Sequence, residues 1–546
     1  MSIDIETLLQ ADTLSEQERE LVATELERRA EPLHFNGVNG ATGGYGLAPM
    51  SGAEFAGVLR GAPPLASDER QECGARSDPG NRAHPIRPGN DPSQLEQAGW
   101  AVIFAARTDS VPYKAALQPL LELRHEQAGA RFLLLDGPQG YRPGEEKRDF
   151  FKRLKISEGP ADPKQLPYYV LLVGSPEEIP YSFQFQLDLM RGVGRIWFET
   201  LEEYENYARS VVRAERGEVV LPQTMSLFGV SNPDDRATEM STRFLIKRLY
   251  ELLTASTDRD DSDAWQFSAL VKEHATKAGL CRLLGGSERP ALLFTASHGM
   301  EFPNADAKQL RHQGALLCQD WPGPRGWRES SIPSDFYFSG DDLAEQKNLL
   351  GMIAVFFACY GAGTPKLDQF ARQAGASARE EIAPSSFVAR LPSKLLSHPS
   401  GGALAVIGHV ERAWGYSFLS ADATAHTNAF EDAVRELMRG QRIGWATESL
   451  NLRYADKATE LSNVLEEESY DGAAKKNPYE LAGLWTASND ARGYVIVGDP
   501  AVRLPLRSTV VAPEGGNTAP VQTRVQTAAA ADVSGAGAGT PGEHSA

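Results

Sequence analysis

The sequence predicts an α/β fold with a mainly parallel central sheet. From about residue 99 to residue 506, short and continuously apolar runs alternate with amphipathic helical patterns. Such runs suit strands that are buried on both faces, and strands that alternate with helices usually pair in parallel. The composition, with 41% hydrophobic and 23% charged residues, is that of a globular protein with a large core. The chain of 546 residues is long enough for several domains.

The expected strands follow one another along this region, and amphipathic patterns between them predict helices over residues 114–125 and 237–253. In chain order the strands are expected at WAVIFAA (100–106), RFLLLDG (131–137), YYVLLVG (168–174), MSLFGVS (225–231), ALLFTA (291–296), MIAVFFA (352–358) and GALAVIGH (402–409).

Composition divides the chain into five segments. Residues 1–30 predict one amphipathic helix, because Ser15 and Glu18 have capping-box spacing and apolar residues follow at helical intervals. Residues 31–95 are rich in Gly, Pro, Asn and Ser, which predicts a loop-rich arm or linker. An α/β subdomain is expected over 96–204 and the main domain over 205–506. Residues 507–546 have no periodicity, and we expect them to be disordered.

Charge and cysteine content exclude several classes of protein. A net charge of −18 argues against a nucleic-acid-binding surface. Cys73, Cys281, Cys318 and Cys359 are widely spaced, without a CxxC pair, which favours a reducing compartment. No basic start followed by an apolar core opens the chain, and no run reaches the roughly 20 apolar residues of a membrane span. We expect a soluble cytoplasmic protein that binds neither nucleic acid nor membrane.

The ends of three predicted strands carry residues that a core does not need. Ligands bind beyond the carboxyl ends of strands in open parallel sheets, and the segments SHGM (297–300), CYGAGTP (359–365) and GHVERAW (408–414) lie at such ends. His298 and Cys359 each end a buried strand, and small residues follow them. His409 is a weaker candidate because no glycine follows it.

A cysteine and a histidine at neighbouring strand ends suggest nucleophilic catalysis. A thiol near neutral pH becomes a thiolate when an imidazole lies within reach. Gly299 permits a tight turn whose N–H, with that of Cys359, can bind an oxyanion. The structural alternative is that Cys359 is a small core residue and His298 a buried, hydrogen-bonded one.

These motifs resemble those of the gingipain-like cysteine peptidases of the caspase-like fold. ALLFTASHGM and MIAVFFACYGAG are similar to the His-Gly and Ala-Cys motifs of that family. VLLVGSPEEIP and GVGRIWFETLEEYENYARSVV precede them and GALAVIGHVERAW and YVIVGDPAVRL follow them in the family's order, over roughly residues 165–506. The resemblance implies a caspase-like three-layer sandwich, with the peptidase domain at 205–506.

The resemblance also implies roles for individual residues. Cys359 would attack the scissile carbonyl, His298 would protonate the leaving amine, and the N–H groups of Gly299 and Cys359 would hold the oxyanion. No third, orienting carboxylate is expected. Secreted gingipains carry an export signal and a propeptide, whereas no such signal is seen here, so the expected role is intracellular.

The substrate pocket is the least defined part of the expected site. In relatives that cleave after basic residues, a carboxylate near the start of a helix lines the primary pocket; Glu239 aligns best here and Asp235 second. Glu411 and Trp414 would wall the same cleft. The alternatives are that Glu239 and Asp235 stabilise a helix start electrostatically, that Trp414 is core and that Glu411 is an ion-pair partner.

The predicted function is therefore a cysteine endopeptidase that acts on proteins or peptides through a thioester, with cleavage after basic residues as the expected preference. No cofactor is implied, although such a fold is compatible with a structural calcium ion. The insert at 301–342 is expected to be either a substrate-binding lid or a surface loop. Lys475 and Lys476 could mark a self-cleavage site or a solvated loop. The second hypothesis is a non-proteolytic scaffold of the same fold that docks in a larger assembly through its amino-terminal helix or its arm.

Overall fold

The computed structural model describes most of the region from residue 37 to residue 506. The predicted amino-terminal helix, the tail from 507, and Lys475 and Lys476 lie outside the described residues, so those predictions stay predictions. The described ranges are 37–46, 65–80, 82–255, 265–327, 330–344, 347–368, 380–419, 426–469 and 478–506.

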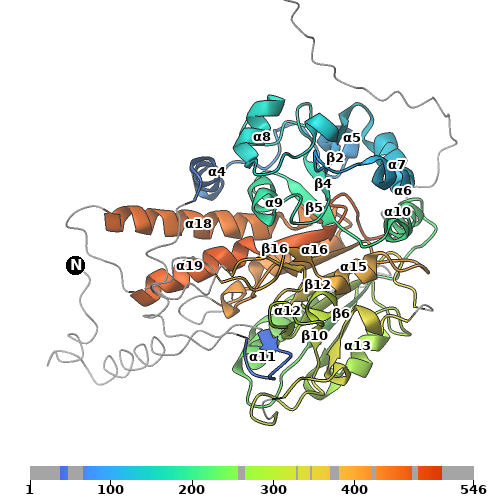
Figure 1. The fold of residues 1–546 in the computed structure, drawn as a ribbon, viewed down its shortest axis with the longest axis vertical. Coiled ribbons are helices and arrows are strands. Elements are labelled where there is room, and N and C mark those ends of the chain that lie inside the picture. The colour runs from blue at the N-terminus through green and yellow to red at the C-terminus, as the bar shows by residue number, and fades with distance from the viewer. Residues whose placement is uncertain are drawn as a thin grey trace, which may run out of the picture. The chain divides into compact units, whose positions relative to one another are not determined.

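A ten-stranded sheet forms the centre of the molecule (Figure 1). Most of its strands are buried along their whole length, because both sheet faces are covered by helices. This confirms the predicted fold class, an α/β sandwich with a mainly parallel sheet. From one edge to the other the strands are β3 (Phe132–Leu135), β2 (Trp100–Phe104), β4 (Tyr169–Val173), β5 (Gly192–Ile196), β16 (Tyr494–Gly498), β15 (Ala405–His409), β12 (Ile353–Phe357), β8 (Leu292–Ala296), β6 (Thr224–Gly229) and β7 (Gln266–Val271).

The sheet reverses its direction once. Each neighbouring pair of strands in this sheet is parallel except β15 and β16, which are antiparallel. The carboxyl ends of β15, β12, β8 and β6 therefore lie together at one edge of the sheet. These are the strands that precede the GHVERAW, CYGAGTP and SHGM segments. The β5–β16 pairing joins strands of the predicted segments 96–204 and 205–506 into one sheet.

Helices flank the sheet (Figure 1), and α18 and α19 lie side by side. The helix expected at 114–125 is divided into α6 and α7, because Pro119 lies in the first turn of α7. The one expected at 237–253 contains a π-helical segment, Ser241–Ile246, between α11 and α12. The helices are α4 (Ser67–Ser77), α5 (Leu95–Ala98), α6 (Val111–Ala116), α7 (Gln118–Ala128), α8 (Lys147–Leu154), α9 (Tyr181–Asp188), α10 (Leu201–Glu215), α11 (Arg236–Met240), α12 (Lys247–Thr254), α13 (Lys277–Leu283), α14 (Gln309–His312), α15 (Arg390–Leu396), α16 (Asn428–Met438), α17 (Ile443–Ala446), α18 (Glu448–Ser469) and α19 (Pro478–Arg492).

A second, smaller sheet follows directly after His298. It has the order β1 (Gly37–Asn39), β9 (Gly299–Glu301), β10 (Leu316–Leu317) and β11 (Tyr337–Phe338). Two short segments of the insert at 301–342 are thus strands of this sheet, and other insert residues pack in a small apolar core beside it. Strand β1 comes from the predicted loop-rich arm and pairs in parallel with β9. Part of the arm is therefore structured beside the candidate site.

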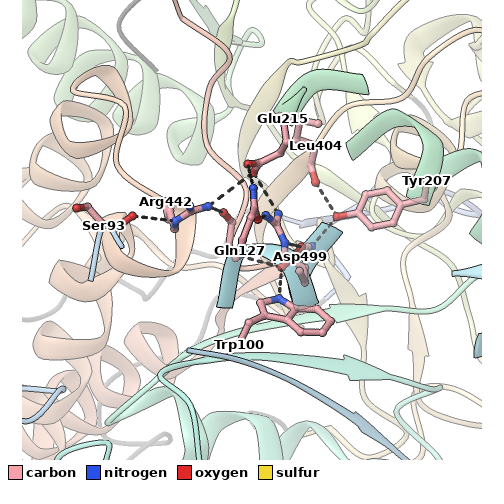
Figure 2. A network of polar contacts seen from close by, with 10 residues as sticks. Ser93, Trp100, Gln127, Tyr207, Glu215, Leu404, Arg442 and Asp499 are labelled. Atoms are coloured by element: carbon pink, nitrogen blue, oxygen red, sulfur yellow. Dashed lines mark hydrogen bonds and ion pairs between the residues drawn. The ribbon is translucent and has the colours of Figure 1, made fainter. Parts of the chain in front are cut away.

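A buried polar network joins β16 to the helices of the amino-terminal half (Figure 2). Arg124 Nε donates to Asp499 Oδ2 at 2.7 Å, and its guanidinium lies 3.2 Å from Glu215. The Trp100 indole donates to the other oxygen of Asp499 at 2.9 Å, and Arg442 lies 3.7 Å from Glu215. Burial opposes the charge on Glu215, yet the two arginines lower the pKa of its carboxyl to about 2. The network is ionised as well as buried.

None of the helices within the described ranges has both the length and the apolar character needed to cross a membrane.

Candidate active site

The register of β8 and β12 brings the two predicted catalytic residues together. Ala296 pairs with Phe357 at the ends of these parallel strands, and His298 and Cys359 each follow two residues later. The Ser297 N–H continues the pairing by donating to the Phe357 carbonyl at 3.2 Å. The predicted pair therefore lies on adjacent strand ends.

Gly299 fits closely against the backbone of Cys359. A Cβ added at Gly299 would lie 1.8 Å from the carbonyl oxygen of Cys359 and 2.9 Å from its nitrogen. No side chain can occupy that space without displacing the Cys359 peptide. The glycine after the histidine is thus required by close backbone approach.

We expect the Gly299→Ala variant to be destabilised by about 1–3 kcal/mol, because the new methyl group overpacks a rigid contact. The free energy of unfolding from urea titration would measure this. Gly74→Ala is the matched control, since a Cβ there meets no atom within 4 Å. Equal stability of Gly299→Ala and wild type would contradict the close packing.

A carboxylate orients His298, contrary to the prediction that no third residue would do so. Asp235 Oδ2 lies 2.6 Å from His298 Nε2, and both side chains are fully buried. Asp235 precedes α11 but makes no capping hydrogen bond to that helix. Instead its carboxylate accepts hydrogen bonds from the Thr238 hydroxyl at 2.5 Å and the Tyr45 hydroxyl at 2.8 Å. The correction arises because β6 lies next to β8, which aims Asp235 at His298.

The electrostatics of this pair fix which imidazole nitrogen is available for chemistry. Burial alone would raise the pKa of Asp235, but His298 and the hydroxyl donors lower it to about 2. The ionised carboxylate accepts the proton on Nε2, so neutral His298 has its lone pair on Nδ1. Among the described residues Nδ1 has no hydrogen-bond partner. It is the nitrogen that can exchange a proton with a thiol or a leaving amine.

The Cys359 sulfur contacts the loop that follows β15. The Ala413 N–H donates to Sγ at 3.2 Å, and the thiol faces the Ala413 carbonyl at 3.7 Å. Burial raises the pKa of the Cys359 thiol well above its usual value, and the Ala413 N–H opposes that rise. Cys359 and His298 are both 0% exposed. The resting arrangement is therefore a closed site with a protonated thiol.

Part of the arm and an insert tryptophan close the site over His298. The rings of Tyr45 and Trp321 pack edge-on against the imidazole, with centroids 6.0 and 6.4 Å away. The N–H and C=O of Met300 bond to the β10 side, so those of its neighbour Gly299 point toward β1. The predicted oxyanion donor thus faces the edge that β1 occupies.

The other predicted substrate residues do not gather in one pocket. Glu239 is exposed on α11, whereas Asp235 faces His298. Glu411 is buried 3.5 Å from Arg412, in the left-handed backbone region at φ 76°. Trp414 is buried, and its backbone N–H donates to the Asp490 carboxylate at 2.8 Å.

His409, the weaker histidine candidate, donates from Nε2 to the Asp490 carbonyl at 2.9 Å. Burial lowers the pKa of this histidine. These features make His409 a neutral structural residue.

Sequence reasoning missed the polar cluster around Arg412, which lies next to the Cys359 loop. Arg412 donates to Asp368 at 2.7 Å and to Glu301 at 3.0 Å. It stands between Glu411 and Trp414 in GHVERAW, both of which were predicted to line the substrate cleft. Its only sequence signal was an arginine at a strand end.

In the part of the chain that the structure describes, the predicted residues form no metal site, and one large cavity lies away from them. Within the described ranges, no three His, Cys, Asp or Glu side chains gather so that they could hold a metal ion. A cavity of about 730 Å³ lies between α16, α18 and α19 and is lined by none of the predicted site residues.

No protein-family model and no curated protein matches the chain. Among solved structures it is similar to one described as a protease, with 12% identity, a TM-score of 0.41, and coverage of 74% of this chain and 78% of the other. It is also similar to the structure of the Arg-specific cysteine proteinase gingipain R, with 13% identity, a TM-score of 0.39, and coverage of 75% of this chain and 78% of the other. A third similar structure is the complex of the pro- and mature domains of RgpB from Porphyromonas gingivalis. It has 14% identity and a TM-score of 0.41, with coverage of 75% of this chain and 80% of the other.

Proposed function

We propose that this protein is a cysteine endopeptidase in which Cys359 is the nucleophile, His298 the proton carrier and Asp235 the residue that orients His298. One observation supports this above all: adjacent strands end in an Asp235–His298 pair and in Cys359, with Nδ1 of His298 left without a partner. A thiol nucleophile needs a base that can come within hydrogen-bond reach, and a histidine with an unpartnered nitrogen on the neighbouring strand end is suited to that role.

The reaction follows from these positions. Neutral His298 accepts the Cys359 thiol proton at Nδ1, and the thiolate attacks the scissile carbonyl carbon. Once β1 has moved from the edge that Gly299 faces, the N–H groups of Gly299 and Cys359 hold the oxyanion. Imidazolium then gives its proton to the amine as the C–N bond breaks, which leaves a thioester. Water, deprotonated by His298, attacks the thioester, and release of the acid returns the thiol. Asp235 stabilises the imidazolium in both steps.

The substrate is proposed to be a protein or peptide, cleaved after a basic residue. Three carboxylates, Asp368, Glu301 and Glu411, lie within 3.5 Å of the guanidinium of Arg412 beside the Cys359 loop. Acidic side chains in this position favour a cationic side chain of the substrate. This cluster replaces Glu239 and Asp235 as the basis for that preference. No cofactor is proposed, and a reducing, cytoplasmic location stays a prediction from the sequence.

A scaffold without proteolytic activity is the second candidate, because the resting dyad is closed. Cys359 and His298 are both 0% exposed, which also describes a latent enzyme whose cover must move before substrate binds. Labelling with a thiol reagent separates the two: a peptidase loses Cys359 labelling when His298 is changed to Ala, while a scaffold labels Cys359 no faster than buried Cys318.

The decisive experiment compares wild type with Cys359→Ala on a peptide library, read by mass spectrometry at neutral pH with and without calcium. We expect cleavage after Arg or Lys that disappears in the variant, because the thioester route needs the thiol. Cys318→Ala, which changes another fully buried cysteine, is the matched control and should retain cleavage. Cleavage that persists in Cys359→Ala would overturn the assignment, and cleavage after other residues would overturn only the basic preference.

A further inference from the structure

The loop of residues 410–417 controls what the Cys359 sulfur touches. It follows β15 and supplies the Ala413 N–H that donates to Sγ at 3.2 Å. A hydrogen bond from an N–H to sulfur favours the thiolate over the thiol. The strength of that bond depends on where the loop holds Ala413.

Asp490, in the last turn of α19, holds this loop at several points. Its carboxylate accepts the Trp414 N–H at 2.8 Å and the Ser417 hydroxyl at 2.5 Å. Its carbonyl accepts the His409 imidazole N–H at 2.9 Å, and His409 is the last residue of β15. Asp490 itself is 0% exposed. One residue of α19 therefore fixes both ends of the loop and the peptide that follows Ala413.

Further contacts keep the Asp490 carboxylate in place. The Ser417 hydroxyl also bonds to the Tyr494 hydroxyl at 2.6 Å. Arg453 of α18 lies 3.6 Å from Asp490 and donates to the Tyr416 carbonyl. The loop is thus anchored in the body by a buried network rather than by apolar packing alone.

We propose that Asp490 is a positioning residue for Cys359, which holds the 410–417 loop so that the Ala413 N–H remains on the sulfur. The inference builds on the proposed nucleophile but not on turnover. It adds a residue from α19 that neither contacts Cys359 by a hydrogen bond nor belongs to the Asp235–His298 pair.

The charges around Cys359 decide how the proposal must be tested. Glu301 from β9, Arg412 from the loop, Asp490 from α19 and Tyr494 from β16 interact electrostatically with the thiol, and His298 follows the adjacent strand β8. The negative charge of Asp490 opposes the thiolate, while its hold on the loop favours it. A comparison with wild type would mix these opposite effects, so the test uses two neutral variants.

The matched pair is Asp490→Asn and Asp490→Leu, which have similar size and no charge. Asparagine retains an oxygen for the Trp414 N–H, and leucine does not. The measurement is the rate of iodoacetamide alkylation at Cys359 as a function of pH, read by mass spectrometry of the cysteine peptide. The pH at which the alkylation rate reaches half its maximum is the midpoint of this profile. We expect the midpoint for Asp490→Leu to lie about one pH unit above that for Asp490→Asn, roughly the effect of one hydrogen bond to a charged acceptor.

Internal controls separate positioning from general loosening. Cys281 in α13 is half-buried, and its alkylation in the same samples should be equal in the two variants. Thermal unfolding identifies folded variants; Asp490→Ala replaces Asp490→Leu if the leucine variant does not fold. Equal midpoints at Cys359 would overturn the proposal.

The experiment also distinguishes this proposal from the proposed function. Alkylation requires no peptide hydrolysis, so a midpoint difference without any cleavage in wild type would support the positioning role and count against the peptidase. Cleavage that depends on Cys359, together with equal midpoints in the two Asp490 variants, would support the peptidase and overturn the positioning role of Asp490.

Discussion

Asp235→Asn is expected to lower kcat/KM for peptide hydrolysis by a factor of about 10²–10⁴, the usual contribution of general acid–base catalysis. The Asp235 carboxylate accepts the proton on His298 Nε2 at 2.6 Å. An asparagine amide can donate to Nε2 instead, which moves the ring proton to Nδ1. Neutral His298 could then no longer accept the Cys359 proton. Steady-state kinetics on a peptide that wild type cleaves would measure the loss.

Asp234→Asn is the matched control for this substitution. Asp234 is the preceding residue, about half exposed, and its nearest charged partner is Arg325 at 3.5 Å. Its backbone is left-handed at φ 56°, a conformation that asparagine tolerates well. We expect this variant to keep wild-type kinetics. A loss in Asp235→Asn no larger than that in Asp234→Asn would remove Asp235 from the mechanism.

The same pair predicts a pH dependence of stability. The pKa of Asp235 is lowered to about 2 from an ordinary value of 3.8. Its ionised form therefore stabilises the fold fully above pH 3.8, and this stabilisation is lost as the pH falls toward 2. The difference in unfolding free energy between wild type and Asp235→Asn should narrow over that range. If the difference in unfolding free energy stayed constant between pH 5 and pH 2, the partners of Asp235 would not be lowering the pKa of its carboxyl.

Arg124→Met is expected to reduce the free energy of unfolding by about 3–5 kcal/mol, the usual cost of leaving a buried charge without its partner. Arg124 is fully buried between Asp499 and Glu215, at 2.7 and 3.2 Å. Methionine fills much of the space, but it removes the positive charge that pairs with the carboxylates of Asp499 and Glu215. Because these residues join β16 to the amino-terminal helices (Figure 2), the loss should affect the whole sheet. Urea unfolding followed by circular dichroism would measure it.

Arg216→Met provides the comparison. Arg216 makes an exposed ion pair with Glu126 at 3.4 Å, with side chains 58% and 72% exposed. Exposed pairs contribute only about 0–1 kcal/mol. Similar losses in the two variants would mean that the buried network is not a principal source of stability.

The sequence predicted most of the strands that are apolar throughout but left out β16, and it missed β5 and β7, which lack a continuous apolar run. Strand β5 contains Arg195, which is buried because Gln184 and the carbonyls of Gly174 and Ile179 accept its hydrogen bonds. No local pattern reveals such partners. Strand β7 is an edge strand with largely exposed residues, so it lacks the continuous apolar run of the central strands.

The candidate site was predictable to the extent that it lies at strand ends. His298 and Cys359 stand at the ends of strands that the sequence identifies, and their adjacency follows from β8 pairing with β12. The direction in which Asp235 points depends on β6 lying beside β8, which only the folded sheet determines. Tyr45 is 190 residues from Asp235 in sequence, and it lay in a segment whose composition predicted loops. The spacing of residues along the sequence does not reveal contacts between segments that are far apart in the chain.

The position of β16 has a consequence for the order of assembly during synthesis. This strand is the last in the chain among the ten, yet it lies in the middle of the sheet, between β5 and β15. Before residues 494–498 emerge, the other strands can form only two separate half-sheets, whose open edges are β5 and β15. Unpaired edges of buried strands readily pair with other chains. A chain that stops before residue 494 should therefore aggregate. The nascent polypeptide needs β16 to join the two half-sheets into one continuous sheet.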